Sequence, residues 1–475
     1  MFEDTKPVDL VGHRLGCGVV VIVGDAHEKN DARAIEGPDH FPVDAHSCVS
    51  GSLQDRAHDD SVPLDCLCPR DAYRPGVVAN PDPPSRLTRS LGLGGAVVVG
   101  MSAMIGTGVF AVWQPAWELA GPWLVMAVLV AGFVAALNAT STARLAALHP
   151  EAGGVYAYAR IYLDRWSSLL AGSVFVVGKT ASAAAAALTI GVYLAPNNAT
   201  AVALAAIAVM LAVNLRGIVR SVRVAATMVT LVVVIVLVLV AAVAGGSLES
   251  SSAPTLDPGG GVLGMLAASA LLFVAFAGYA RVTILGEEVR NPARTIPRAV
   301  AFSFIIVASL YLLVAVTVMT SATLGVELGL AALSDIAAAT SLAWLPPLVK
   351  VAAVLAAGAV LMSLIAGVGR TLFAMADRGD APRALAAVGT TVRIPYRAEI
   401  AAAMGAAVLV LFGGLTVALG ISAAMILTYY AVGHLAAMRL PRRPRGYFVR
   451  LMPYLGLVGC LVVVGALVVE AVRGG

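Results

Sequence analysis

Charged residues are scarce in this chain. Asp, Glu, Lys and Arg make up 13% of its 475 residues, and aromatic residues make up 6%. In soluble domains about a quarter of the residues are charged. The mean hydropathy of +0.88 points the same way. Such a composition excludes a soluble globular protein and predicts an all-α polytopic membrane protein, whose helices pack against one another within lipid.

The apolar part of the chain also lacks the side chains that most catalytic sites use. After residue 84, the only histidines and cysteine are His149, His434 and Cys460. The phosphate-binding pattern Gly-x-x-x-x-Gly-Lys-Ser/Thr is absent, and its nearest approach, around Lys179, falls inside a membrane segment. We therefore expect no enzyme, no cofactor, no metal, no nucleic-acid partner and no transport driven by ATP.

The first 84 residues are a different kind of polypeptide. They hold 7 basic and 15 acidic residues, whereas residues 85–475 hold 25 basic and 13 acidic ones. Cys66-Leu67-Cys68 lies among scattered histidines but matches no zinc-binding spacing. This composition is typical of a disordered acidic extension. The alternative is that translation begins near Val77 or Val78. We expect a transporter core over residues 85–440 and an additional membrane helix within residues 441–475.

Eleven apolar segments approach or exceed the length of about 20 residues that crosses a bilayer. With the N-terminus in the cytoplasm, 21 of the 25 basic residues after position 84 fall in inner loops or at inner helix ends. This asymmetry follows the positive-inside rule and, with an odd number of spans, places the C-terminus outside. The expected spans are 95–118, 122–147, 167–194, 199–215, 224–245, 262–285, 299–320, 346–374, 396–418, 420–438 and 451–471.

The first span contains a predicted break. Gly100, Gly106, Thr107 and Gly108 fall where a membrane helix should be most regular, and glycine lets the backbone leave the helix. In lipid a broken helix is tolerated beside a cavity or a ligand, and such breaks mark the binding sites of transporters. Freed amides at residues 106–108 would favour an anion such as a carboxylate. The alternative is a small-residue surface for close helix packing.

The sixth span contains a second predicted break, at the central glycine Gly278 between Phe273 and Thr283. Backbone carbonyls freed there would suit an ammonium group. Two breaks five spans apart predict an inverted repeat of five plus five helices, with a binding site between the halves.

With these two breaks and the motifs given below, the chain resembles the amino acid permeases of the amino acid–polyamine–organocation superfamily. The resemblance covers residues 90 to about 440, in the family's order and spacing. It departs from the family at Ala280-Arg281, where many members have an acidic or small polar residue, and in its 11 rather than 12 expected spans. The matching motifs are GMSAMIGTGVF at 100–110, PEAGGVYAYAR at 150–160, NLRGI at 214–218, FAGY at 276–279, GEEVRNPARTIPR at 286–298 and GRTLFAMADRG at 369–379.

The resemblance implies a leucine-transporter-like fold with alternating access and a substrate at mid-membrane. It implies that backbone groups of Ile105, Gly106, Thr107 and Gly108 hold the substrate carboxylate. Carbonyls around Val274, Ala275 and Ala277 would take the amine, and Phe273 or Phe276 would form an aromatic lid on the outer side.

Charged residues within or next to the spans are candidates for coupling and gating. Lys179 lies in the middle of the third span, where we expect it to replace a coupling cation or contact the substrate; the alternative is a lysine that faces water in the cavity without a coupling task. Arg281, Glu287 and Glu288 follow the second break toward the cytoplasm, and we expect them in an inner gate. Simple capping of the next helical turn is the alternative for the two glutamates.

The sequence therefore predicts a secondary transporter of an amino acid or related amine in the cell membrane, coupled to protons or working by exchange. Membrane carboxylates are scarce, which favours a neutral amino acid, although Glu118 near the outer end of the first span could pair with a cation. The alternative is a membrane sensor that binds an amino acid without moving it. The oligomeric state and the identity of the amino acid do not follow from the sequence.

Overall fold

The computed structural model describes residues 92–148, 154–217, 222–248, 260–279, 289, 291–389, 394–440 and 447–473. The chain divides into two units, residues 1–80 and 81–475, and every described residue belongs to the second. The predicted acidic extension over residues 1–84 lies outside the described residues.

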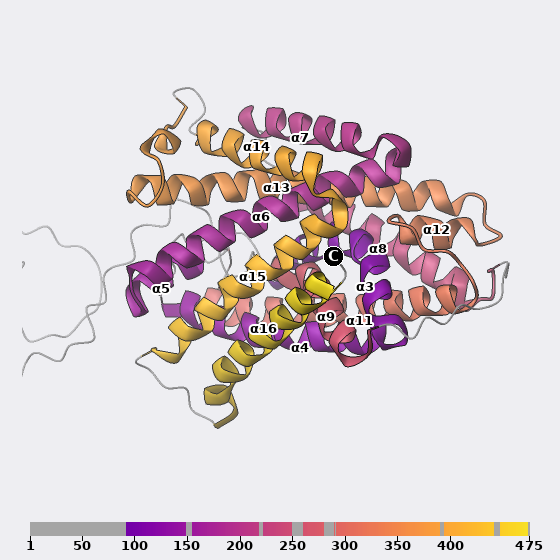
Figure 1. Cartoon of the computed structure of the whole chain (residues 1–475), viewed down its shortest axis with the longest axis horizontal. Coiled ribbons are helices and arrows are strands. Elements are labelled where there is room, and N and C mark those ends of the chain that lie inside the picture. Colours follow the sequence, from indigo (N-terminus) through magenta and orange to yellow (C-terminus); the bar gives the residue numbers. More distant parts are fainter. Residues whose placement is uncertain are drawn as a thin grey trace, which may run out of the picture. The chain divides into compact units, whose positions relative to one another are not determined.

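The described part of the chain is helical, apart from connecting turns and an isolated bridge between Leu248 and Thr340 (Figure 1). The first half contains α1 (Leu93–Met104), α2 (Gly108–Ala111), α3 (Trp113–Ala120), η2 (Gly121–Trp123), α4 (Leu124–Leu148), α5 (Gly154–Tyr162), α6 (Arg165–Leu194), η3 (Pro196–Asn198), α7 (Ala199–Leu215) and α8 (Val222–Ala244). The second half contains α9 (Gly261–Phe276), η4 (Ala277–Tyr279), α11 (Pro292–Thr323), α12 (Ala332–Ala338), α13 (Leu345–Asp377), η5 (Arg383–Ala386), α14 (Tyr396–Phe412), α15 (Gly414–Met438) and α16 (Tyr447–Arg473).

Ten helical stretches of the described residues are long and apolar enough to cross a membrane, so the prediction of a polytopic all-α protein is confirmed. The ninth expected span, 396–418, is not among these ten. It is helical as α14, but α14 has 17 residues and ends at Phe412. Gly414, with φ of 67°, begins α15 directly afterwards. This left-handed residue ends the span six residues before its predicted end.

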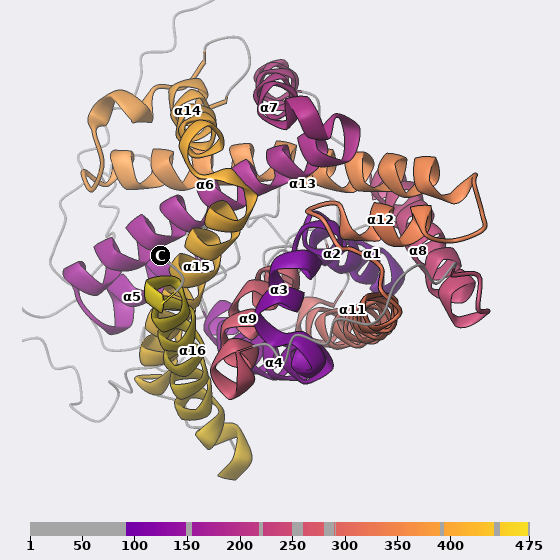
Figure 2. The same cartoon turned by 45° about the vertical axis from the view of Figure 1, so that its right-hand side comes forward.

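Eight of the membrane helices fall into two groups by their contacts. One group is α1, α4, α9 and α11; the other is α6, α7, α13 and α14 (Figures 1 and 2). Helix α15 packs mainly on α6 of the second group but also touches α4 and α9 of the first. Helix α16 lies against α15, α9 and α4, and α8 contacts both α1 and α13.

Local chemistry explains several helix starts. Asp164 caps α6, where its carboxylate accepts a hydrogen bond from the Ser167 amide at 2.9 Å. Helix α11 begins with Pro292, whose missing N–H costs nothing in the first turn.

The middle of α6 is made of small residues. Ala183 to Ala187 are five consecutive alanines, each at most 2% exposed. Such small side chains let neighbouring membrane helices approach α6 closely on all sides.

Candidate functional site

The first membrane helix is interrupted where the sequence predicts. Helix α1 ends at Met104, and Ile105 leaves the helical region with φ of −80° and ψ of 81°. Helix α2 restarts the chain at Gly108. Thr107, between the two pieces, is 8% exposed, and its hydroxyl has no partner among the described residues. A buried polar group without a partner costs about 1–3 kcal/mol, a cost that binding sites retain and a ligand can relieve.

The sixth membrane helix also loses its α-helical form near the predicted glycine. Helix α9 ends at Phe276, and Ala277–Tyr279 form a single 3₁₀ turn. The predicted gate residues Arg281, Glu287 and Glu288 follow this turn and lie outside the described residues.

The two interruptions are in direct contact with each other. A Cβ atom on Gly108 would lie 2.5 Å from the Cα of Ala275, and one on Gly278 would overlap the carbonyl group of Ala103. Only glycine fits at both positions, because each faces backbone rather than a flexible side chain. A Cβ on Gly106 would instead overlap a side chain, that of Val360 on α13. The structure thus brings together the two segments that the sequence predicts to form one site.

Two tyrosines that the sequence analysis did not single out form hydrogen bonds with the interrupted helices. The Tyr311 hydroxyl on α11 lies 2.8 Å from the Met104 carbonyl oxygen and 3.3 Å from that of Ala275, so its hydrogen serves both interruptions. The Tyr193 hydroxyl on α6 donates to the Phe110 carbonyl at 3.0 Å. Each is the only tyrosine of its span, and a lone hydroxyl in an apolar segment is a signal that could have identified it.

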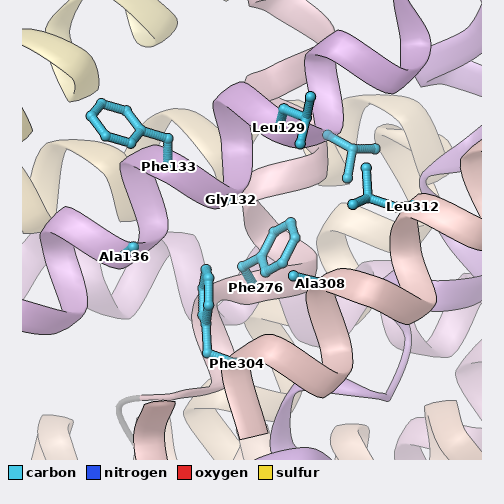
Figure 3. A pocket seen from close by; sticks show the side chains of 9 residues that line it. Leu129, Gly132, Phe133, Ala136, Phe276, Phe304, Ala308 and Leu312 are labelled. Carbon is cyan, nitrogen blue, oxygen red and sulfur yellow. The ribbon is translucent and has the colours of Figure 1, made fainter. Parts of the chain in front are cut away.

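The two candidate lid residues point toward different neighbours. The Phe273 ring meets Tyr430 of α15 edge-on, with 5.8 Å between ring centroids. The Phe276 ring packs on Tyr311 at 5.0 Å and on Phe304 at 5.4 Å. Figure 3 shows Phe276 beside Phe304 in an apolar groove of about 210 Å³. The groove is lined by Val128, Leu129, Gly132, Phe133, Ala136, Phe276, Phe304, Ala308 and Leu312.

Lys179 lies on α6 and is half-buried. Its neighbour Gly178 packs against Met425 of α15, and Thr180 faces Gly405 of α14. Tyr193, which bonds the outer part of the first helix, is 14 residues farther along α6, or about 21 Å at 1.5 Å per residue.

A second polar cluster joins α5 to the end of α13. The Asp380 side chain is fully buried and accepts hydrogen bonds from the Tyr156 hydroxyl at 2.8 Å and from Arg160 at 2.6 Å. Arg165 approaches it at 3.5 Å. Burial alone would raise the pKa of the Asp380 carboxyl, but these three partners outweigh it and hold that pKa below the usual 3.8. The cluster fixes the loop after the second span against the eighth.

We expect the Asp380→Asn variant to unfold a few degrees below the wild type at neutral pH. It removes a buried charge and leaves Arg160 and Arg165 unneutralised, a loss of about 1–2 kcal/mol after solvent screening. A carboxyl whose pKa is lowered by folding stabilises the fold above its unfolded pKa and loses that contribution as pH falls through the folded pKa. The difference should therefore persist unchanged from pH 8 to about pH 5. Thermal unfolding in detergent measures it, with the exposed Asp377→Asn as control; equal midpoints for Asp380→Asn and wild type would refute the role of this carboxylate.

Interrupted helices that meet inside a bundle of membrane-length helices define a polytopic membrane transporter, because such breaks mark transporter binding sites. The model of the amino acid permease family matches residues 95–469 of this chain. The chain belongs to that family, as the sequence motifs predict. Members of the family and the relatives described next are transporters rather than enzymes.

Three relatives show how the chain compares with known proteins. An uncharacterized transporter of Mycobacterium tuberculosis is 43% identical over 400 residues, which cover 83% of this chain and 90% of the relative. The vacuolar cationic amino acid transporter 2 of Arabidopsis thaliana is 29% identical over 358 residues, covering 69% and 56%. A branched-chain amino acid permease of Bacillus subtilis is 26% identical over 339 residues, covering 65% and 72%.

Proposed function

We propose that the chain is a secondary transporter that moves an amino acid across the cell membrane by alternating access, with proton coupling or exchange. The observation behind the proposal is the contact of Gly108 with Ala275 and of Gly278 with Ala103, which joins two interrupted helices at membrane depth. The loop charges support a cytoplasmic N-terminus and an outer C-terminus.

The first interruption supplies donors for a substrate carboxylate. Of the four predicted residues, Ile105 and Gly106 already donate their amides to Met101 and Met104 at 2.7 and 3.0 Å. The amides of Thr107 and Gly108, together with the unpartnered Thr107 hydroxyl, are therefore the groups we assign to the carboxylate. A hydrogen bond from these buried amides to an anion would be electrostatically stronger than the same bond in water, because the surrounding dielectric is low.

The sixth helix supplies acceptors for the substrate amine. We assign this role to carbonyls of Val274, Ala275 and Ala277, with Phe273 or Phe276 as the outer lid. The Ala275 carbonyl shares the Tyr311 hydrogen at the longer distance of 3.3 Å, which leaves it capacity to accept an ammonium hydrogen. Arg281, Glu287 and Glu288 remain our candidates for the inner gate.

The grouping of the helices supports an inverted repeat of five plus five helices. The first, second, sixth and seventh spans (α1, α4, α9 and α11) pack together, and so do the third, fourth, eighth and ninth (α6, α7, α13 and α14). The first group thus contains the first and second helices of each predicted five-helix half, and the second group contains the third and fourth helices of each half. In the proposed cycle one group moves against the other and exposes the site to each side in turn.

The substrate that we favour is a neutral amino acid. The residues of both interruptions carry no carboxylate that would hold a cationic side chain. Glu118 is exposed and is bonded by Gln114 on the same helix. The relatives include cationic and branched-chain transporters, so both types of amino acid belong in a first screen.

Two measurements test the proposal. The purified protein is screened for a rise of its unfolding midpoint with each common amino acid, because a ligand stabilises the state it binds. Proteoliposomes are then assayed for uptake of the radiolabelled amino acids that bind. Binding with uptake supports a transporter, and binding without any flux supports the sensor alternative.

We expect the Lys179→Ala variant to lose at least about tenfold in net uptake, because the proposed ammonium that takes the place of a coupling cation is removed. Uptake into proteoliposomes between about pH 5.5 and 8.5 measures the effect. Lys350→Ala removes an exposed lysine near an outer helix end and is the control. Uptake by Lys179→Ala that equals the wild type at every pH would exclude a coupling role.

A further inference from the structure

A buried polar cluster lies apart from the two interruptions, where α4, α15 and α16 meet. The His434 ring on α15 places Nδ1 3.0 Å from the Ser141 hydroxyl and Nε2 2.5 Å from Asn138 Oδ1, both on α4. Cys460 of α16 donates from Sγ to the same Asn138 oxygen at 3.4 Å. His434 and Cys460 are two of the few histidines and cysteines after residue 84. The structure joins them through Asn138.

The cluster is sealed from solvent and built for the imidazole. His434 and Asn138 are each 1% exposed. A Cβ on Gly456 of α16 would overlap the His434 ring, so α16 closes over the ring only because residue 456 is glycine. An ionisable side chain at membrane depth is rare and marks a functional site by default.

The partners of His434 suit both protonation states of the ring. In the neutral ring with its hydrogen on Nε2, that hydrogen is donated to Asn138 and the Ser141 hydroxyl donates to Nδ1. When Nδ1 takes a proton, the Ser141 hydroxyl turns and accepts from it. A second proton therefore enters without leaving a ring N–H unsatisfied, which is the main cost of charging a buried group after desolvation.

Little in the surroundings neutralises a charged imidazole. Titratable groups of the surrounding elements include Cys460 on α16, Tyr430 one turn earlier on α15, and Tyr279, whose ring lies 5.7 Å from that of Tyr430. Arg439 follows the end of α15, and α6, on which α15 packs, carries Arg165 and Lys179. The charged residues of the described parts of α4 and α16 are farther along: Arg144 and Arg450 toward one end, and Glu470 and Arg473 toward the other. No carboxylate lies on α15 or on the described part of α4, so neither helix supplies a fixed counter-charge that would trap a proton on the ring.

One buried polar atom of the cluster, the Asn138 amide nitrogen, has no partner among the described residues. Tyr279 belongs to the 3₁₀ turn of the sixth helix and stacks on Tyr430. Aromatic contacts thus run from the interrupted helix to Tyr430, one turn from His434, and the Asn138 amide offers a hydrogen-bonding site to entering water.

We propose that His434 is the proton-binding site of the transport cycle. The inference rests on the proposed function as a proton-coupled carrier and assigns the proton to a place distinct from the substrate site. A proton from outside water, arriving while the substrate is bound, adds to the Nδ1 lone pair. It leaves to cytoplasmic water when α4 and α9 separate from α15. No bond other than this N–H forms or breaks, and Lys179 then acts as a fixed charge.

The test compares net uptake with exchange in the same proteoliposomes, using a mixture of the twenty radiolabelled common amino acids as probe. His434→Gln can still bond Asn138 but cannot carry a proton. We expect uptake driven by a pH gradient to fall at least about tenfold and exchange to stay within about twofold of the wild type. The control is Tyr454→Phe on the exposed face of α16, which should retain both activities.

A second variant tests the site in the opposite direction. Asn138→Asp puts a carboxylate at 2.5 Å from Nε2, which stabilises the charged ring. We expect the pH profile of net uptake to move to higher pH by about one unit or more. A role confined to packing would leave the profile unmoved.

The outcomes separate the two proposals. If His434→Gln keeps gradient-driven uptake, if it loses uptake and exchange equally, or if Asn138→Asp leaves the pH profile unchanged, His434 is not the proton site. Wild-type protein that exchanges substrate but shows no gradient-driven uptake also overturns this inference while leaving the transporter assignment intact. Wild-type protein that binds an amino acid and moves none overturns the proposed function itself.

Discussion

The Gly278→Ala variant should reach the membrane and lose at least about tenfold of its transport. A methyl group at this position would overlap the Ala103 carbonyl and lie 2.6 Å from the Met104 amide nitrogen. Both are backbone atoms of the first helix, so no side-chain rotation relieves the clash. Overpacking of this kind costs about 1–3 kcal/mol, and each 1.4 kcal/mol is about a factor of ten in an equilibrium.

This loss should arise at the substrate site rather than from general instability. The new methyl group separates the two interruptions, so amides and carbonyls that should grip the same ligand no longer face it at the same time. Binding, measured as the ligand-induced rise of the unfolding midpoint, should weaken together with uptake. The control is Gly94→Ala, because a Cβ at Gly94 meets no atom within 4 Å. Transport by Gly278→Ala at the wild-type rate would mean that the contact of the two helices is not part of the site.

The Tyr311→Phe variant is expected to bind its substrate about tenfold more weakly. The hydroxyl at 2.8 Å from Met104 O and 3.3 Å from Ala275 O is removed, which leaves two carbonyls at the interruptions without this donor. An unsatisfied buried acceptor costs about 1–3 kcal/mol, so the helix ends would rearrange away from the geometry that the substrate needs.

The phenylalanine ring keeps the packing that Tyr311 provides. Its edge contacts with Trp113, at 6.2 Å, and Phe276, at 5.0 Å, do not involve the hydroxyl. The unfolding midpoint without ligand should therefore fall by much less than the affinity does. Titration of the substrate in the thermal-shift assay measures the affinity, and Tyr454→Phe on the exposed face of α16 is the control. An unchanged affinity would show that Tyr311 is only a packing residue.

The interruption of the first helix could be predicted to within a residue or two because its causes are local. Gly106, Thr107 and Gly108 weaken the helix wherever the chain runs, and membrane helices tolerate such residues only for a reason. The end of α9 near Gly278 followed from the same argument. The number of spans was also readable, since apolar length and loop charge are properties of the sequence, although the left-handed Gly414 made α14 shorter than expected.

The tyrosine bonds and the histidine cluster could not be predicted in this way. Tyr311 is 207 residues from Met104, and His434 is 296 residues from Asn138. Hydrophobic periodicity says which segments are helical but not which faces of distant helices meet. The sequence showed His434 only as one of two histidines after residue 84. Its partners, an asparagine and a serine, carry no signal of their own in a long apolar segment.

The alanine run of α6 bears on how easily neighbouring helices can change position. Ala183 to Ala187 present only methyl groups, buried on every side. A methyl group has no rotamer to unlock, so a helix crossing this surface can turn or slide without first rearranging interlocked side chains. Long interdigitating residues would instead hold neighbours in one register and resist small displacements. This stretch of α6 therefore offers little steric resistance to the displacement of a neighbouring helix. Replacing one of its alanines by leucine would add a side chain that resists such a displacement.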